Sequence, residues 1–116
     1  MQLKSVGQTP PTPRSGHSIV TVGKKNILFG GIDNSPKKNG KLYPNNQVYT
    51  IRIIGNNYEW FQQQCTGEIP LPRSNHGACA IGQDRMFIFG GYYTSDTRFN
   101  DVYFLSVRRK GREMRK

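Results

Sequence analysis

The residues of this chain best suited to chemistry are His17 and His76, its two histidines. Two imidazoles could bind a metal ion, or one could act as a general base. Each histidine, however, ends the same pattern, Pro-x-Pro-Arg-Ser-x-His, at residues 11–17 and 70–76. A residue that recurs with a repeated scaffold usually belongs to that scaffold. We therefore expect structural histidines, and we predict neither a metal site nor a cofactor.

The cysteines and carboxylates offer no better catalytic arrangement. Cys65 and Cys79 lack the C-x-x-C spacing of redox and zinc sites, and neither has an obvious base beside it. Asp33, Asp96 and Asp101 are scattered, and no pair of carboxylates stands out as acid and base. The sequence therefore predicts no catalytic residue and a protein that is not an enzyme. So few cysteines also argue against a secreted disulfide scaffold.

The repeated pattern extends well beyond the histidines. After each histidine comes a short apolar run, a polar turn and a second apolar run that ends in Phe-Gly-Gly. Further along, "NNQVYTI" at 45–51 matches "FNDVYFL" at 99–105. The offset between copies is 59 residues at the histidines and 54 at these segments, because the first copy has a longer loop after its glycines. Length changes confined to one loop are typical of a structural repeat.

Short apolar segments bounded by Gly, Pro, Asn or Asp must hold these residues in place. They are rich in β-branched and aromatic residues and show no sustained helical period, so the fold class is predicted to be all-β. A repeat of this length made of strands is typical of a propeller blade. We expect strands at about 16–22, 26–30, 47–53 and 59–64 in the first copy, and at 77–81, 86–90 and 101–107 in the second.

Together these elements resemble kelch repeats of the galactose oxidase-like β-propellers, over about residues 9–107. The resemblance implies one four-stranded antiparallel blade per repeat, used mainly to bind other proteins. Enzymes with kelch-like propellers exist, including a copper oxidase, but its ligand set is not recognisable here. The resemblance also implies structural roles for the motif residues, which are Arg14, His17, Gly30, Gly31, Tyr49, Trp60, Arg73, His76, Gly90, Gly91 and Tyr103.

Physical chemistry supports these structural roles. The Gly-Gly pairs permit backbone angles that a Cβ would forbid. The forked guanidinium groups of Arg14 and Arg73 can bind carbonyls of a neighbouring turn. The large aromatic side chains of Tyr49, Trp60 and Tyr103 are expected to pack between blades.

Partner binding is expected where the two copies differ. In an up-and-down blade, the loop between strands two and three and the link to the next blade emerge at the same end. That end would carry residues 32–44, 66–73 and 92–99. Tyr and Arg are enriched in binding hot spots, and basic residues favour an acidic partner. The alternative is that these are merely solvated loops. The candidate partner-binding residues are Lys37, Lys38, Lys41, Tyr43, Tyr92, Tyr93 and Arg98.

Half of the net charge of +10 lies in the C-terminal segment 108–116, which has six basic residues and one acidic residue. A solvated, disordered tail is the simplest interpretation; a nuclear-import signal or a patch for an acidic partner is the alternative. No nucleic-acid-binding motif accompanies it, so nucleic acid is an unlikely partner. No apolar run approaches membrane-spanning length. We expect a cytoplasmic protein, with the nucleus as an alternative through the basic tail.

Four units are predicted: an N-terminal segment at 1–11, repeat one at 12–65, repeat two at 66–107 with three strands, and the tail at 108–116. Residues 2–6 are expected to be the fourth strand of a neighbouring blade, and could complete the second blade. Propellers generally need about four or more blades. The chain is therefore expected to be a fragment of a longer kelch protein, or to form a ring of three or four copies.

The resulting functional hypothesis is a non-catalytic protein-interaction module, a kelch-repeat scaffold or adaptor. One alternative is the substrate-recognition part of a ubiquitin-ligase adaptor, which would need an additional adaptor-binding domain. A second alternative is a fragment of a kelch-type propeller enzyme, which would retain a metal or small molecule on purification.

Overall fold

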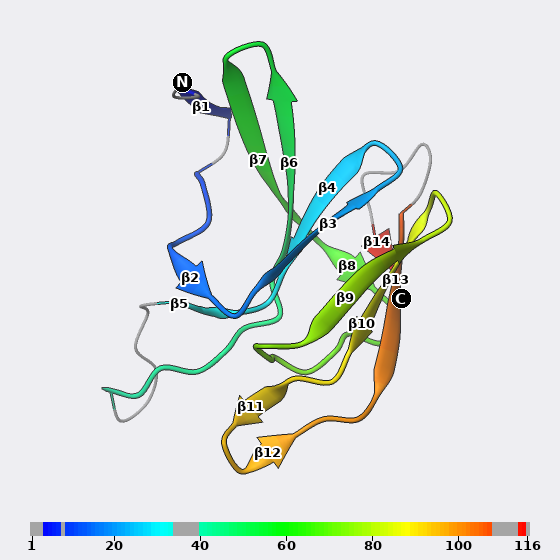
Figure 1. Cartoon of the computed structure of the whole chain (residues 1–116). Coiled ribbons are helices and arrows are strands. Elements are labelled where there is room, and N and C mark those ends of the chain that lie inside the picture. Colours follow the sequence, from blue (N-terminus) through cyan, green and yellow to red (C-terminus); the bar gives the residue numbers. More distant parts are fainter. Residues whose placement is uncertain (1–3, 8, 34–39, 108–113, 116) are drawn as a thin grey trace.

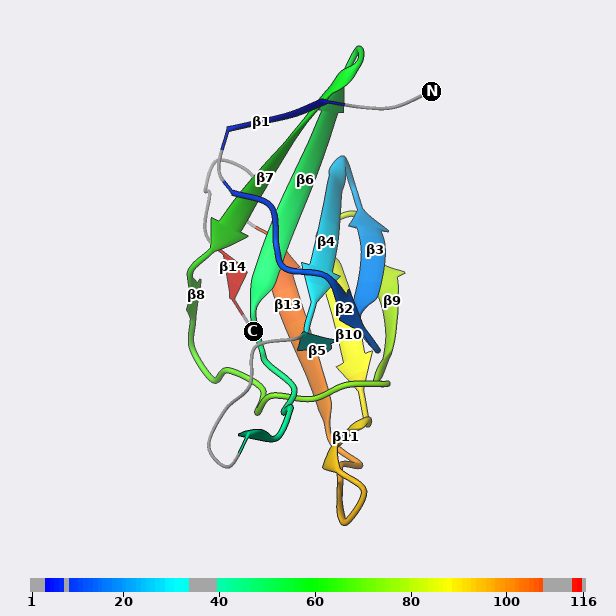
Figure 2. The ribbon, with the colours of Figure 1, turned by 90° about the vertical axis from the view of Figure 1, so that its left-hand side faces the viewer.

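Strands form the whole regular framework of this computed structural model, which describes residues 4–7, 9–33, 40–107 and 114–115. They form two larger sheets that lie side by side, with two short two-stranded pairs beyond one end (Figures 1 and 2). The chain is therefore all-β, as the sequence predicts. The first sheet runs, edge to edge, through β1 (Lys4–Gly7), β7 (Asn57–Gln63), β6 (Val48–Ile54), β4 (Lys25–Phe29) and β3 (Ser18–Val22).

Tight turns at glycine set the boundaries of these strands. Gly23 joins β3 to β4 with a φ of 61°, and Gly55 joins β6 to β7 with a φ of 60°. Positive φ is inexpensive only for glycine, so each turn occurs where the sequence places one. The strands accordingly begin and end within about two residues of the predicted ranges.

The second sheet repeats this plan. Gly82, with a φ of 64°, turns its first hairpin as Gly23 does in the first sheet. The two short pairs join β2 (Arg14–Ser15) to β5 (Ile32–Asp33) and β11 (Tyr92–Thr94) to β12 (Thr97–Arg98). The second sheet runs through β8 (Cys65–Thr66), β14 (Met114–Arg115), β13 (Val102–Val107), β10 (Arg85–Phe89) and β9 (Gly77–Ile81).

The chain termini differ from the expectation that an N-terminal strand completes the second blade. Instead, β1 runs parallel to β7 at the edge of the first sheet. The fourth position of the second sheet is taken by β14, which pairs antiparallel with β13. Only residues 108–113 separate β13 from β14, so this pairing closes a much shorter loop than pairing with the N-terminus would. Residues 108–113 and 116 of the predicted disordered tail lie outside the described residues, and the predicted unit boundaries remain a prediction.

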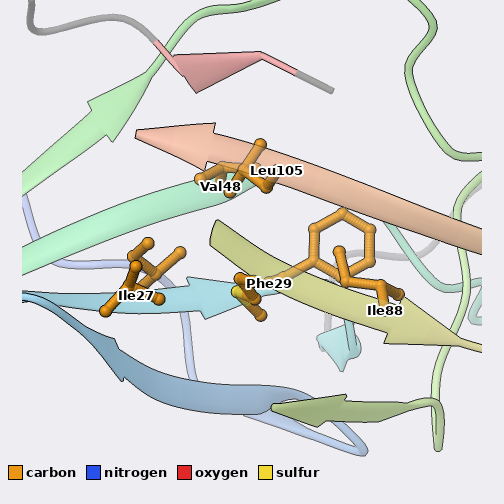
Figure 3. Close-up of a cluster of buried hydrophobic side chains, with 7 residues drawn as sticks. Ile27, Phe29, Val48, Ile88 and Leu105 are labelled. Carbon is orange, nitrogen blue, oxygen red and sulfur yellow. The ribbon is translucent and has the colours of Figure 1, made fainter. Parts of the chain in front are cut away.

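The hydrophobic core lies between the two sheets (Figure 3). Alternation along each strand turns every second side chain toward it. Ile27, Phe29, Met86 and Ile88 are at most 1% exposed. The structure is thus two packed, blade-like sheets, the arrangement that the repeat resemblance implies for neighbouring propeller blades. The core residues are Val22, Ile27, Phe29 and Val48 from the first sheet and Met86, Ile88 and Leu105 from the second.

Candidate partner-binding surface

The predicted binding loops of both blades meet at one end of the molecule, where β11 and β12 project beyond the sheets (Figure 1). Tyr43, from the first loop, stacks on Tyr93 of β11, with ring centroids 5.3 Å apart and planes at 15°. Both tyrosines are partly exposed. An aromatic stack that joins two blades and stays open to solvent is the type of surface that commonly anchors a protein partner.

Tyr92 is held firmly beside this stack. Its main chain exchanges two hydrogen bonds with Ser74, each 3.0 Å long. Its hydroxyl accepts a hydrogen bond of 2.9 Å from Asn75 Nδ2. The guanidinium of Arg98 lies 5.5 Å from the centre of the Tyr92 ring. The loop therefore presents an aromatic ring and a cation on a backbone that is fixed to the neighbouring turn.

The link between the blades belongs to the same surface. Asn46 Nδ2 donates a 3.0 Å hydrogen bond to the carbonyl of Pro70, and the Arg73 amide donates a 3.2 Å hydrogen bond to the carbonyl of Asn45. These bonds tie the link to the first loop. Leu42 and Leu71 are 49% and 60% exposed here and were not among the predicted binding residues. Both leucines lie in loops that the sequence predicts to bind a partner, and this position could have identified them.

The charge of this surface is mixed. Lys41 and Arg98 are exposed, but so are Asp96 and Glu68. Lys37 and Lys38 lie outside the described residues. The positive charge is therefore concentrated in the first loop, where sequence 32–44 holds three lysines and one aspartate. That aspartate, Asp33, is buried and accepts a 2.7 Å hydrogen bond from Thr12.

The two repeated arginines, Arg14 and Arg73, hold the turns beneath this surface through hydrogen bonds to backbone carbonyls. Arg73 is completely buried and donates to the carbonyls of Gly90 and Leu71, both at 3.0 Å. Arg14 makes the equivalent bonds to the carbonyls of Gly30 and Thr12, at 3.3 and 3.2 Å. Both arginines thus bind carbonyls of nearby turns, as expected for their fork geometry.

The three motif aromatics do not share one environment. Tyr103 packs against the core between the blades. Tyr49 and Trp60 pack edge to face, at 6.2 Å, but on the face of the first sheet turned away from the second. Their alternation in the strands puts them opposite the core residues Phe29 and Val48. Tyr103 therefore packs between the two blades of this chain, whereas packing between blades remains a prediction for Tyr49 and Trp60.

His76 and Ser18 form a contact that the sequence analysis missed. His76 Nε2 lies 2.8 Å from Ser18 Oγ, across the junction of the two blades. A serine beside a histidine could form a nucleophile and base. Burial above all, then the charges of Arg73 and His17, lowers the pKa of His76 to about 4. His76 Nδ1 is buried without a hydrogen-bond partner, and the Phe29 ring packs edge-on against the imidazole, with ring centroids 5.1 Å apart. The pair fits a structural bond better than a catalytic one.

Burial of His76 should make stability depend on pH. Between about pH 4 and 6.5 the unfolded chain binds a proton that the folded chain does not, so stability is full above pH 6.5 and falls toward pH 4. After discounting for solvent screening, we expect a loss of about 1–2 kcal/mol over this window. Urea unfolding of wild type and His76→Gln across this range measures it.

The matched control for this measurement is His17→Gln, because His17 occupies the equivalent position but is exposed. Because the charge of His17 makes a smaller contribution to the lowered pKa of His76, the His17→Gln profile should be only slightly flatter than that of the wild type, whereas the His76→Gln profile should be much flatter. Three parallel profiles would show that His76 does not titrate differently on folding.

The two cysteines lie in different environments. Burial raises the pKa of the Cys65 thiol, which disfavours the nucleophilic thiolate. Cys79 is a free, exposed thiol on β9. Among the residues that the structure describes, no group of three or more His, Cys, Asp or Glu side chains could hold a metal ion. Nor does this part of the chain contain a helix long and apolar enough to cross a membrane.

Two packed blades with repeated arginine, histidine and Gly-Gly positions define a repeat β-propeller segment. Residues 1–110 match the KLHDC2/KLHL20/DRC7 Kelch-repeats domain, so the chain belongs to the Kelch-repeat family. This family assignment supports a protein-interaction module.

Individual relatives agree with the assignment. Dynein regulatory complex subunit 7 of Chlamydomonas reinhardtii is 36% identical over 81% of this chain and 8% of its own length. Kelch domain-containing protein 3 of Homo sapiens is 34% identical over 87% of the chain and 25% of its own length. Kelch domain-containing protein 2 of Bos taurus is 31% identical over 81% and 21%. The chain thus spans a quarter or less of each of these relatives.

Proposed function

We propose that the chain is a non-catalytic scaffold or adaptor module that binds a protein partner through the loop end of its blades. The stacked pair Tyr43 and Tyr93 is the observation that carries this proposal. It is partly exposed, joins the two blades, and has exposed Leu42 and Leu71 in the adjoining segments. Aromatic anchors flanked by apolar and polar groups are typical of binding hot spots.

The partner segment would be acidic. The first loop is the most basic of the three, and each of the two loops that carry the stack has an exposed cation, Lys41 in one and Arg98 in the other. Cations favour an acidic partner through steering and complementarity. The name of one relative, a dynein regulatory complex subunit, places that protein in an assembly with other proteins. A cytoplasmic location, or a nuclear one through the basic tail, belongs to this proposal.

The weak base at His76 supports a role without catalysis. Its pKa of about 4 leaves a neutral ring with little capacity to accept a proton from Ser18 near neutral pH. The distribution of functional groups therefore favours recognition over a reaction.

A defined peptide probe can test the binding surface. A phage-displayed library of random peptides is selected on the wild-type chain, and the enriched peptides are synthesised. We expect acidic sequences whose affinity falls roughly 10- to 100-fold in the Tyr43→Ala, Tyr93→Ala double variant, since both anchors are lost. Fluorescence polarisation measures the affinity, and circular dichroism checks that the variant is folded.

The matched control is Tyr58→Ala, which removes a partly exposed tyrosine from β7, outside the loops. It should bind the selected peptides as the wild type does. Peptides that bind wild type and double variant equally would reject the stack as the binding site, and basic peptides would reject the acidic partner.

A further inference from the structure

Each of the two sheets has one face in the core and an outer face with exposed apolar side chains. On the outer face of the first sheet, Leu28 and Tyr49 are already buried, at 4% and 8% exposure, and Arg14 lies over the Tyr49 ring. The outer face of the second sheet carries residues equivalent to core residues of the first. Phe29 is 1% exposed, whereas its equivalent Phe89 is 55% exposed. Val48 is 5% exposed, whereas its equivalent Val102 is 51% exposed. We call this surface the free face of the second sheet; it consists of Cys79, Ile81, Phe87, Phe89, Val102 and Phe104.

The first sheet has the complementary free face. The second sheet packs into the core through Ala78, Ile88 and Leu105. Their equivalents in the first copy, Ile19, Leu28 and Ile51, lie on the side of the first sheet away from the core. We call this surface the free face of the first sheet; its partly or fully exposed aromatic and aliphatic members are Ile19, Ile51, Ile53, Tyr58 and Trp60.

These two free faces are therefore the two halves of an interface that the chain already contains. The free face of the first sheet is equivalent to the core-facing side of the second sheet. The free face of the second sheet is equivalent to the core-facing side of the first sheet. Asn26 stands where Met86 stands in the second sheet, but its amide already bonds with Thr21 at 2.7 Å and the carbonyl of Ile51 at 3.5 Å. It can be covered without losing its partners.

The surroundings of the Gly-Gly turns show the same difference between the two blades. A Cβ at Gly30 would meet the carbonyl of Arg73 at 2.8 Å and the His76 ring at 3.0 Å, both from the neighbouring blade. At the equivalent Gly90 the nearest atom is the Phe99 carbonyl, at 3.4 Å, from the same blade. His17, the equivalent of His76, is exposed. The space beside Gly90 therefore corresponds to the one that Arg73 and His76 fill inside the chain.

We propose that the first sheet of a second copy of this chain docks on the free face of the second sheet, in the geometry that joins the two blades internally. Arg14 and His17 of the incoming copy would lie beside Gly90, as Arg73 and His76 lie beside Gly30. The contact joins two different faces, so it is head to tail and closes into a ring if the rotation allows. With two blades per chain, a ring of six or eight blades, within the range of about four to eight found in propellers, takes three or four copies.

This association differs from partner binding at the loop end and does not depend on the proposed function. Its driving force is burial of the exposed apolar side chains on both faces. The net charge of +10 on each copy opposes it at long range. Self-association should therefore strengthen as salt screens the charge.

Light scattering on the purified chain tests the proposal at about 0.15 M salt, where the screening length is about 8 Å. The expected mass is three or four times the 13.2 kDa of one chain. Phe89→Asp and Ile19→Asp should each reduce the mass to that of one chain, because each blocks one face. Leu42→Asp is the matched control: it adds the same charge at a side chain 49% exposed, at the loop end, and should leave the ring intact.

Mixing the two blocked chains gives the decisive measurement. Each keeps one intact face, so a head-to-tail contact predicts a discrete dimer containing one chain of each variant. A symmetric dimer through one face would instead leave one variant dimeric alone and give no mixed species. A wild-type chain that is monomeric, or self-association that survives both aspartates, overturns the proposal; circular dichroism confirms that both variants are folded.

Discussion

Replacing Arg73 by methionine is expected to lower the free energy of unfolding by about 3–5 kcal/mol, the largest effect predicted for a single substitution in this chain. Arg73 is completely buried and pairs with Asp101 through two hydrogen bonds of 2.6 and 3.1 Å. It also binds the carbonyls of Gly90 and Leu71 and lies 4.1 Å from the centre of the Phe99 ring. Methionine fills part of the volume but leaves two carbonyls and a carboxylate without these donors.

The matched control for this prediction is Arg14→Met in the first copy. Arg14 is half-buried and bonds to neutral groups, Asn45 Oδ1 at 3.3 Å and Gln47 Oε1 at 3.1 Å. Without a charged partner and with water nearby, its loss should cost about 1–2 kcal/mol. Urea unfolding compares the Arg73→Met and Arg14→Met variants, at a protein concentration at which the oligomeric state of the chain does not change.

A double substitution separates the ion pair from the rest of the Arg73 environment. In the Asp101→Asn background, Arg73→Met should cost clearly less than in the wild type, because part of its cost is the loss of the charged pair. Equal costs in both backgrounds, or equal costs for Arg73 and Arg14, would mean that packing rather than ion pairing gives Arg73 its importance.

The strand framework could be predicted from the sequence because its boundaries depend on local chemistry. Gly23, Gly55 and Gly82 all adopt positive φ between consecutive strands, and these are the turns that the sequence marks. The partners of the edge strands could not be predicted in this way. The edges of β7 and β13 each need a neighbour, and which segment supplies it depends on chain closure rather than on local pattern.

The candidate site, too, could be predicted only where it depends on local sequence. The up-and-down order of the strands indicated which loops share one end of the molecule, but not that Tyr43 and Tyr93 stack across it. Ser18 and His76 are 58 residues apart, and their contact exists only because two blades pack together. Tyr49 and Tyr103 are equivalent in sequence, yet only the latter faces the internal core. Such differences arise from which face of each blade is covered, and a single repeat cannot encode that.

Gly30→Ala is expected to lower the free energy of unfolding by about 2–4 kcal/mol. Gly30 has a φ of 70°, which alanine adopts at a cost of about 1 kcal/mol or more. The added Cβ would also meet the carbonyl of Arg73 at 2.8 Å, so the second blade must shift. Thermal and urea unfolding measure the loss.

Gly90→Ala separates the contact between blades from the backbone strain. The strain at Gly90 is the same as at Gly30, but no neighbouring blade lies beside Gly90. Gly90 has a φ of 69°, and its new Cβ would meet nothing closer than 3.4 Å. In the isolated chain it should therefore cost only about 1 kcal/mol. In a ring, Gly90 acquires the environment of Gly30, and the same substitution should both destabilise the chain and weaken the association between copies. Equal losses for the two glycines in a monomeric chain would mean that backbone strain alone, and not contact between blades, requires glycine at these positions.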